Sequence, residues 1–335
     1  MTTVAVTLGD AAGIGPEIVV KAFADPRINP GCSAFVVGHA ATVERAAQRF
    51  APGLAVRRIA SAAAHVPCVG VVDVMDVGHL PDNLPMGLVS ACAGQAAFEA
   101  IDHAITMALK GEVAAICTAP IHKEALAAAG VRFPGHTEML AERTGSTDTA
   151  MMLVNPQLRT ILVTVHCAMR EAVELLSVER ELRIIMLAHR SLRAMGIAQP
   201  RIAVVGLNPH AGEGGLFGSE DIQLIAPAIA QARALGVDAS GPHPGDTVFM
   251  QARKGRYDIV VAQYHDQGLI PIKLLGVEDG VNVTAGLPFV RTSPDHGTAF
   301  DIAGLGIADA SSLKTALLTA VQLSQGAHIL NQENR

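Results

Sequence analysis

Residues 3–24, TVAVTLGDAAGIGPEIVVKAFA, decide the fold class, because a short apolar run is followed by a glycine-rich turn and then by an apolar helical pattern. The run Thr3 to Leu8 predicts a strand that is buried on both faces. Pro16 suits the first turn of the helix expected over Pro16 to Ala24, because its missing N–H has no partner to lose there. A buried strand followed by a helix is the unit from which parallel βαβ folds are built.

The same alternation of apolar strands and helical patterns recurs along the chain. Further strands are expected at Ala114 to Cys117, Thr160 to Val165, Arg201 to Leu207 and Asp258 to Gln263. Further helices are expected at Ala93 to Lys110, Lys123 to Ala129, Val178 to Met195 and Ile222 to Leu235. The sequence therefore predicts an α/β protein with mainly parallel sheets and with helices on both faces of them.

The composition predicts a folded protein and argues against nucleic-acid binding and membrane association. The 335 residues are 50% hydrophobic and 17% charged, which predicts about two folded domains and excludes a disordered chain. The 25 basic residues are outnumbered by 31 acidic ones, which argues against nucleic-acid binding. Five widely spaced cysteines without a C-x-x-C motif predict a reducing, cytoplasmic location. No signal-peptide pattern and no run of about 18 apolar residues is found, so we expect no membrane association.

Histidines follow three of the expected strands. His166, His210 and His265 each lie at or just beyond the carboxyl end of an apolar run. Because ligands bind beyond the carboxyl ends of parallel strands, these side chains can converge. Three imidazoles with an open position suit a divalent metal that polarises substrate or water, whereas the alternative is that each histidine only hydrogen-bonds to nearby backbone. Asp246 and Asp266 could orient such ligands or act as acid or base, or could be ordinary loop residues.

A second set of residues suggests an anion site. His136 and Thr137 lie where a helix is expected to begin, and a helix N-terminus binds phosphate through its free N–H groups. Lys273, Asn282 and Arg291 lie in apolar segments marked by glycine or proline, and the two cations could form charge-assisted bonds to a carboxylate or phosphate. The alternative interpretation is that Lys273 and Arg291 are solvated surface charges.

Neither glycine cluster matches the usual dinucleotide-binding turn. Residues 212–218, GEGGLFG, have Phe217 where the last glycine of Gly-x-Gly-x-x-Gly is required, and residues 13–16, GIGP, fail as well. Both clusters are interpreted as tight turns. A dinucleotide, if bound, would need a different site.

Five segments together resemble the 4-hydroxythreonine-4-phosphate dehydrogenase (PdxA) family of vitamin B6 biosynthesis. They are residues 9–17 (GDAAGIGPE), 135–138 (GHTE), 208–213 (NPHAGE), 264–268 (YHDQG) and 286–298 (GLPFVRTSPDHGT). The segments occur in the family's order over nearly the whole chain. One departure is Ala11, where members of the family commonly have proline.

The resemblance implies an isocitrate/isopropylmalate dehydrogenase-like fold with two α/β/α domains around a central cleft. We expect residues 1–130 and 300–335 to form the first domain. Residues 131–299 are expected to form the second, which would carry most of the metal and substrate residues. The family also implies a homodimer whose active site is completed at the subunit interface.

The resemblance also implies roles for the residues that match the family's motifs. His166, His210 and His265 would bind one divalent metal, zinc in the first place, with magnesium or cobalt as alternatives. The phosphorylated substrate would be held by His136, Thr137, Lys273, Asn282 and Arg291. The general base would be Asp246 or Lys273. The cofactor would be NAD or NADP, and no binding residue is assigned to it.

The family's reaction is the oxidation of the C3 hydroxyl of 4-phosphooxy-L-threonine by NAD(P), giving a 3-oxo acid that decarboxylates to 3-amino-2-oxopropyl phosphate. One alternative is a dehydrogenase of a related hydroxy acid, erythronate or threonate 4-phosphate. Unphosphorylated dihydrodiol dicarboxylates are disfavoured, because the phosphate-binding pair His136 and Thr137 is intact. From other classes, a metal-dependent hydrolase and a non-catalytic phosphometabolite-binding protein remain as alternatives.

Overall fold

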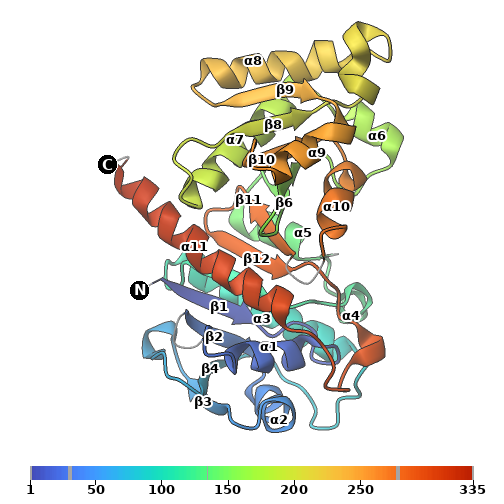
Figure 1. The fold of residues 1–335 in the computed structure, drawn as a ribbon. Coiled ribbons are helices and arrows are strands. Elements are labelled where there is room, and N and C mark those ends of the chain that lie inside the picture. Colours follow the sequence, from blue (N-terminus) through green and yellow to red (C-terminus); the bar gives the residue numbers. More distant parts are fainter. Residues whose placement is uncertain (1, 29–31, 134, 277–279, 334–335) are drawn as a thin grey trace. The chain divides into compact units, whose positions relative to one another are not determined.

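The computed structural model describes residues 2–28, 32–133, 135–276 and 280–333, which belong to two compact units (Figure 1). Unit 1 consists of Met1–Thr147 and Leu287–Ser324, and unit 2 of Asp148–Gly286 and Gln325–Arg335. Two units were expected, but with different boundaries: residues 131–147 and 287–299 lie in unit 1, and residues 325–335 lie in unit 2. The first two segments join unit 1 because one packs into its core and the other adds a strand to its sheet.

The sheet of unit 1 is parallel throughout, with strand order β3-β4-β2-β1-β5-β12. Its strands are β1 (Thr3–Thr7), β2 (Ser33–Gly38), β3 (Ala55–Ile59), β4 (Val71–Asp76), β5 (Ala115–Thr118) and β12 (Val290–Pro294). In the central register Val6 lies opposite Val36 on one side and Cys117 on the other. The central strands are therefore buried on both faces, which explains their nearly continuous apolar sequences.

Helices cover both faces of this sheet (Figure 1). They are α1 (Gly15–Phe23), α2 (Ala40–Phe50), α3 (Ala91–Leu109), α4 (Lys123–Ala128), α5 (His136–Thr144) and α11 (Ser311–Glu333), with short 3-10 turns at Ala62–Ala64 and Phe300–Ile302. Only the part of α11 up to Ser324 belongs to unit 1. The right-handed crossover rule places α1 and α2 on one face and α3 on the other, because the strand order reverses at β1. Gly94 of α3 lets α4 approach closely, since a Cβ there would collide with the backbone of Ala125.

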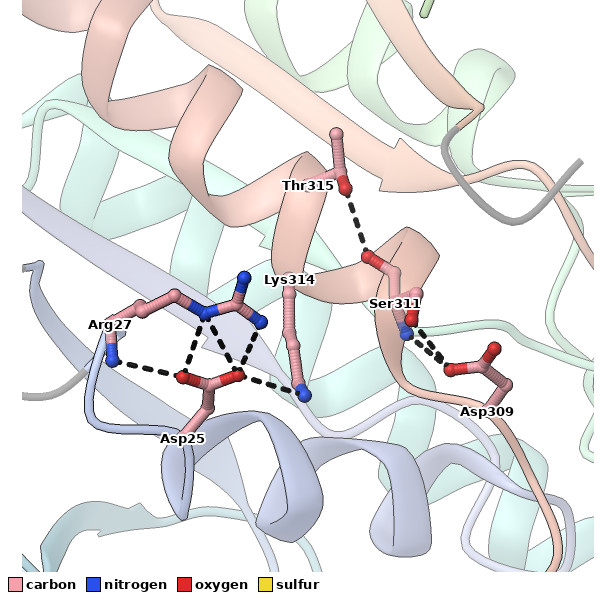
Figure 2. Close-up of polar contacts among 6 residues, drawn as sticks. All are labelled: Asp25, Arg27, Asp309, Ser311, Lys314 and Thr315. Carbon is pink, nitrogen blue, oxygen red and sulfur yellow. Dashed lines mark hydrogen bonds and ion pairs between the residues drawn. The ribbon is translucent and has the colours of Figure 1, made fainter. Parts of the chain in front are cut away.

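An ion pair between Lys314, near the start of α11, and Asp25, just after α1, connects the two helices (Figure 2). Asp25 accepts hydrogen bonds from the backbone N–H and guanidinium of Arg27 and from Lys314 Nζ at 3.0 Å. These contacts hold the pKa of the Asp25 carboxyl well below its usual range. Asp309 accepts from the backbone N–H and hydroxyl of Ser311, both at 2.8 Å, and so fixes the first turn of α11.

The sheet of unit 2 has strand order β11-β6-β7-β10-β8-β9. Its strands are β6 (Ala150–Val154), β7 (Arg159–Leu162), β8 (Ile202–Val205), β9 (Ala239–His243), β10 (Ile259–Ala262) and β11 (Val281–Ala285). β6 runs antiparallel to both β7 and β11, and the remaining pairs are parallel. The fold class is therefore confirmed as α/β with mainly parallel sheets.

Helices also pack on both faces of the second sheet. They are α6 (Met169–Glu174), α7 (Val178–Ala194), α8 (Ala226–Ala234), α9 (Gly245–Arg253) and α10 (His265–Lys273), with a 3-10 segment at Pro209–Gly215 and one π-helical turn at Asp221–Ile225. The helices α9 and α10 bury Val248, Leu269 and Ile272 against strand residues such as Leu162 and Val260. The pair α7 and α8 packs together at the sheet.

The expected strands and helices are all present, but most of the strands end earlier than expected. Four of the five expected strands end one to three residues early, at Thr7, Leu162, Val205 and Ala262. The residues directly after these ends are Leu8, Val163, Gly206 and Gln263, and they lead into the loops that carry the polar residues. No helix among the described residues combines the length and apolarity needed to cross a lipid bilayer.

Candidate active site

The three strand-end histidines lie at one edge of unit 2. His166 follows β7, His210 follows β8, and His265 is the first residue of α10, directly after β10. These strands are adjacent and parallel, in the order β7-β10-β8, so their carboxyl ends lie at the same edge. The expected convergence toward one edge is therefore present.

His166 and His265 face each other across a pocket. Their ring centroids are 5.7 Å apart, and both side chains line the pocket together with Cys167, Tyr264 and Asp266. His265 Nδ1 lies 2.7 Å from Asp266 Oδ1, an arrangement in which the ring donates to the carboxylate. Such a bond fixes the tautomer and leaves Nε2 as a lone-pair donor, which is how metal-binding histidines are usually oriented.

His210 belongs to a neighbouring pocket of the same unit. This second pocket is also lined by Asn208, Asp246 and Gln267, and it shares Tyr264 and Asp266 with the first. Within the described ranges of a single chain, no group of three or more His, Cys, Asp or Glu side chains is arranged to hold a metal ion. One chain thus gathers the histidines at one edge without assembling a complete three-ligand site, and the assignment of the ligands stays a prediction.

His210 begins a left-handed turn of backbone. Six consecutive residues, 210–215, have positive φ, among them the non-glycine residues His210 (51°), Ala211 (53°) and Glu213 (43°). Each non-glycine residue in this conformation costs about 1–2 kcal/mol. The glycine-rich segment 212–218 is thus a tight turn, as interpreted from the sequence, and the strain shows that other contacts hold His210 in place.

The contacts that hold this turn come from Asp221, which is completely buried. Its Oδ1 accepts the N–H of Leu207 at 2.8 Å, and its Oδ2 accepts the N–H and side-chain amide of Asn208 at 3.2 and 2.9 Å. Gly206 leaves room for the carboxylate, since a Cβ there would lie 2.7 Å from Asp221 Oδ1. Three hydrogen bonds to one buried carboxylate therefore fix the segment that leads into His210.

Unit 1 contains a buried cation beside an imidazole. Arg291 of β12 is only 4% exposed and donates from Nη2 to Thr118 Oγ1 at 2.8 Å. Burial lowers the pKa of Arg291 to about 10, so that the guanidinium stays charged at neutral pH. Burial, and then the Arg291 charge, lower the pKa of His136 well below its usual value, and His136 Nε2 has no protein partner among the described residues. A buried positive charge next to a neutral imidazole suits an anion.

The start of α5 belongs to the same part of unit 1. His136 and Thr137 are the first two residues of this helix, and Gly135 provides no side-chain cap for its N–H groups. Thr137 is exposed. The expected association of His136 and Thr137 with a helix N-terminus is therefore present, and Arg291 lies close enough to act on His136.

The remaining predicted residues are placed in unit 2. Lys273 is the exposed last residue of α10, and Asn282 is half-buried on β11 opposite Leu153. Asp246 is exposed in the first turn of α9 and lines the same pocket as His210. The proposed substrate residues are therefore divided between the units, with His136, Thr137 and Arg291 in unit 1.

A further polar cluster at the strand ends of unit 1 was left without a role by the sequence. Asp10 follows β1, is completely buried, and has a pKa raised by burial. A hydrogen bond from the N–H of Ala12 and the proximity of His122, which follows β5, partly offset this rise in the pKa of Asp10. The His122 ring stacks on Phe300 at 4.4 Å between centroids. The spacing of the polar residues after each apolar run was the signal that could have identified this pair.

Three buried polar residues beneath the histidines of unit 2 were also missed. Glu181, Asp221 and Gln263 are each at most 1% exposed. A signal for Glu181 exists in the sequence, because it lies on the same helical stripe as the buried Ile184, Ile185 and Ala188 of α7. A charged residue on the apolar stripe of a helix indicates a carboxyl group that is buried instead of solvated.

Comparison with known proteins identifies relatives that match nearly the whole chain. The family model described as "Pyridoxal phosphate biosynthetic protein PdxA" matches residues 30–320. The chain is 56% identical to a 4-hydroxythreonine-4-phosphate dehydrogenase of Beijerinckia indica, over 95% of this chain and 94% of that protein. It is 49% identical to a D-threonate 4-phosphate dehydrogenase of Salmonella typhimurium, over 96% of this chain and 99% of that one.

A solved structure shows the same architecture. The crystal structure of a 4-hydroxythreonine-4-phosphate dehydrogenase from Klebsiella pneumoniae superposes with a TM-score of 0.89 at 50% identity, covering 97% of this chain and 98% of that chain. The fold is of the isocitrate/isopropylmalate dehydrogenase-like type that the sequence led us to expect.

The left-handed turn gives a stability prediction. Asp221→Asn places an amide N–H₂ against at least one backbone N–H that the carboxylate now accepts. We expect the free energy of unfolding to fall by about 2 kcal/mol, measured by urea denaturation. The matched control is Glu220→Gln, because that side chain accepts from Asn208 Nδ2 and can still do so through its amide oxygen. Equal stability of the two variants would refute the role given to Asp221.

Proposed function

The chain belongs to the PdxA family and is a dehydrogenase, and we propose that it oxidises 4-phosphooxy-L-threonine with NAD or NADP. The product would be a 3-oxo acid that decarboxylates to 3-amino-2-oxopropyl phosphate, as a step in pyridoxal 5'-phosphate biosynthesis. Either nicotinamide cofactor suits this proposal. The substrate is a small phosphorylated molecule, so the site must bind a phosphate and must also activate a hydroxyl group.

The observation that carries the proposal is the anion site of unit 1. Arg291 holds a buried charge, and beside it, at the start of a helix, lies His136, whose Nε2 has no hydrogen-bond partner in the part of the chain that the structure describes. Phosphate is the group that such an arrangement binds best, because it accepts hydrogen bonds and offsets the cation. We assign Thr137 to the same contact. Lys273 and Asn282 of unit 2 are assigned to the remaining substrate oxygens.

The histidines of unit 2 fit a divalent metal. His166 and His265 face one pocket, and the bond of His265 to Asp266 leaves its Nε2 available, so we propose that these two and His210 hold the ion. A divalent cation bound there, zinc in the first place and magnesium or cobalt as alternatives, would supply Lewis-acid activation of the substrate hydroxyl. The imidazoles must be neutral to bind it.

The general base is proposed to be Asp246. It lines the same pocket as His210, whereas Lys273 is not among the residues that line either pocket. A carboxylate at this place can accept the proton of the hydroxyl group while hydride leaves the same carbon. Lys273 then serves the substrate through its positive charge.

We propose that the protein acts as a homodimer. The described part of one chain holds no three-ligand group, and the exposed Leu216 and Phe217 (73% and 46%) lie in the segment that follows His210. Large apolar side chains exposed next to a catalytic pocket are typical of an interface. We therefore propose that a second copy covers this segment and completes the site.

A cytoplasmic location belongs to the same proposal. All five cysteines are free thiols, and none of them has the spacing of a redox pair. Free thiols persist in a reducing compartment, which also contains the nicotinamide cofactors that the reaction uses.

D-Threonate 4-phosphate is the second candidate substrate, because a relative with that name is 49% identical to the chain. The two molecules share the phosphate and the C3 hydroxyl and differ at C2, which carries an ammonium in one and a hydroxyl in the other. Asp246 and Asp266 give the pocket of His210 two carboxylates. Carboxylates favour the ammonium, which is why 4-phosphooxy-L-threonine is placed first.

A substrate panel tests this function directly. With the metal-loaded protein and NAD or NADP, we expect 4-phosphooxy-L-threonine to give a kcat/KM at least about tenfold above D-threonate 4-phosphate and D-erythronate 4-phosphate. The absorbance of the reduced nicotinamide reports each rate, and unphosphorylated 4-hydroxythreonine is the control for the anion site. The reverse order would identify a threonate or erythronate 4-phosphate dehydrogenase. No reduction of cofactor with any compound would contradict the proposal and would favour a hydrolase or a binding protein.

The metal assignment gives a separate prediction. His210→Ala should lose bound metal and lower turnover by at least about 100-fold, because a ligand matters more than the groups that orient it. Elemental analysis of the purified protein measures the first effect and the nicotinamide assay the second. His103→Ala, an exposed position on α3, is the control and should leave both unchanged. A normal metal content in His210→Ala would remove His210 from the ligand set.

A further inference from the structure

Glu181 is a buried acid that no step of the proposed reaction uses. It lies in the first turn of α7 and is 0% exposed, and neither carboxyl oxygen has a hydrogen-bond donor among the residues that the structure describes. A buried carboxylate without donors is very unfavourable, so the group needs either a partner or a proton.

The side chain that lies against Glu181 is the amide of Gln263. Gln263 connects the ends of three strands. Its side-chain Nε2 donates to Val205 O at the end of β8, and its backbone carbonyl oxygen accepts a hydrogen bond from Thr164 Oγ1 after β7, both at 2.8 Å. Its own N–H, just after β10, donates to Gln267 Oε1 at 2.7 Å, and Gln267 Nε2 donates to Gly206 O at 2.9 Å. Each of these strand ends continues within a few residues into a proposed metal ligand.

One acceptor of this network, the side-chain oxygen of Gln263, receives none of these hydrogen bonds. Gln263 Oε1 is buried and has no donor in the described chain, which is also true of both oxygens of Glu181. Three acceptor oxygens without a donor cannot pair unless one of them carries a proton. A protonated Glu181 provides one O–H and satisfies Gln263 Oε1.

Electrostatics favour the protonated form. Burial, and then the negative charge of Asp221, raise the pKa of Glu181 to about 8, while Gln263 and the Arg180 cation act in the opposite direction. Asp221 comes from the π-helical turn packed against α7, and Arg180 from α7 itself. At neutral pH the acid is therefore mostly neutral.

We propose that Glu181 is a positioning residue for the histidine set, and that it acts as a neutral carboxylic acid which donates a hydrogen bond to Gln263 Oε1. This bond fixes the rotamer of Gln263, which in turn holds the ends of β7, β8 and β10 at the spacing that His166, His210 and His265 require. The role in metal binding rests on the proposed function. The protonation state does not, because it concerns the protein without metal.

Protonation can be tested through the pH dependence of stability. The unfolded chain releases the Glu181 proton near the ordinary value of about 4.3, and the folded protein keeps it to about pH 8. Between these values the unfolded state binds fewer protons, so folding becomes less favourable as pH rises. Glu181→Gln removes this linkage, because its amide is neutral at every pH and can still donate to Gln263.

The first experiment compares metal-free wild type with Glu181→Gln and with Glu179→Gln by denaturant unfolding at several pH values. Glu179 lies in the same helical turn but is exposed, so its variant makes the same carboxyl-to-amide change at an acid that is not buried. We expect the folding equilibrium constant of Glu181→Gln relative to wild type to rise about tenfold per pH unit between about pH 5 and 8. The ratio for Glu179→Gln should not rise in this way. A constant ratio for Glu181→Gln would show that Glu181 is ionised and would overturn the proposal.

The second experiment measures positioning by calorimetric titration of the metal-free proteins with zinc alone. Glu181→Gln should keep the zinc affinity of wild type, because its amide donates to Gln263 Oε1. Glu181→Leu is also neutral but cannot donate, and we expect it to bind zinc at least about tenfold more weakly. Wild-type affinity in Glu181→Leu would refute the positioning role.

A third variant separates this proposal from the function on which it rests. His166→Ala should abolish high-affinity zinc binding. If it binds zinc like wild type, the ligand assignment of the proposed function fails, and with it the positioning role of Glu181. The unfolding experiment still decides the protonation state in that case, because it contains no metal.

Discussion

The side-chain amide of Gln263 is the contact on which the proposed metal site depends. It lies just after β10, donates to the last carbonyl of β8, and its backbone carbonyl accepts the hydroxyl of Thr164 after β7. Parallel strands end at one edge by geometry alone, but geometry does not fix how far apart their loops begin. A buried amide with defined partners does fix it, because leaving any of these groups unpaired costs about 1–3 kcal/mol. The spacing of the three histidines is therefore set by Gln263 and its hydrogen-bond partners, which take no part in the proposed oxidation.

Unit 1 depends on a different constraint, the burial of a positive charge. Arg291 is paired with the neutral hydroxyl of Thr118, and its pKa of about 10 keeps it charged at neutral pH. A buried cation is stabilised most by an anion, and the phosphate of a substrate supplies one. His136 contributes a neutral imidazole, because burial and Arg291 keep its pKa low. The phosphate would then be held away from the bond that reacts, so that its binding energy serves to orient the substrate.

The sequence predicts five of the strands from their apolar runs, together with the polar residues that follow them, and these include His166, His210 and His265. The apolar strands β2, β4 and β6 were not among the expected strands. The elements without such patterns could not be predicted: β9 has the sequence ASGPH, and β12 contains the buried Arg291. Arg291 could equally have been a surface charge, because only the pairing of β12 with β5 buries it. The roles of Glu181 and Asp221 depend on contacts between distant segments, which no local pattern encodes.

The left-handed turn at His210 shows the same limit. Its glycines indicated a turn, but they did not show that Asp221 accepts three bonds from Leu207 and Asn208, the residues that lead into His210. The local motif predicts the turn, whereas the buried carboxylate that holds the preceding segment comes from a later part of the chain. Strain of this kind, held by a buried group, is typical of functional sites.

Anomalous X-ray diffraction from crystals of the zinc-loaded protein locates the metal without assuming a role for any residue. We expect one zinc peak for each active site, about 2.0–2.1 Å from imidazole nitrogens of His166, His210 and His265, with the set completed across a dimer. A zinc ion held by other side chains, with these histidines bonded only to backbone or solvent, would contradict the metal assignment.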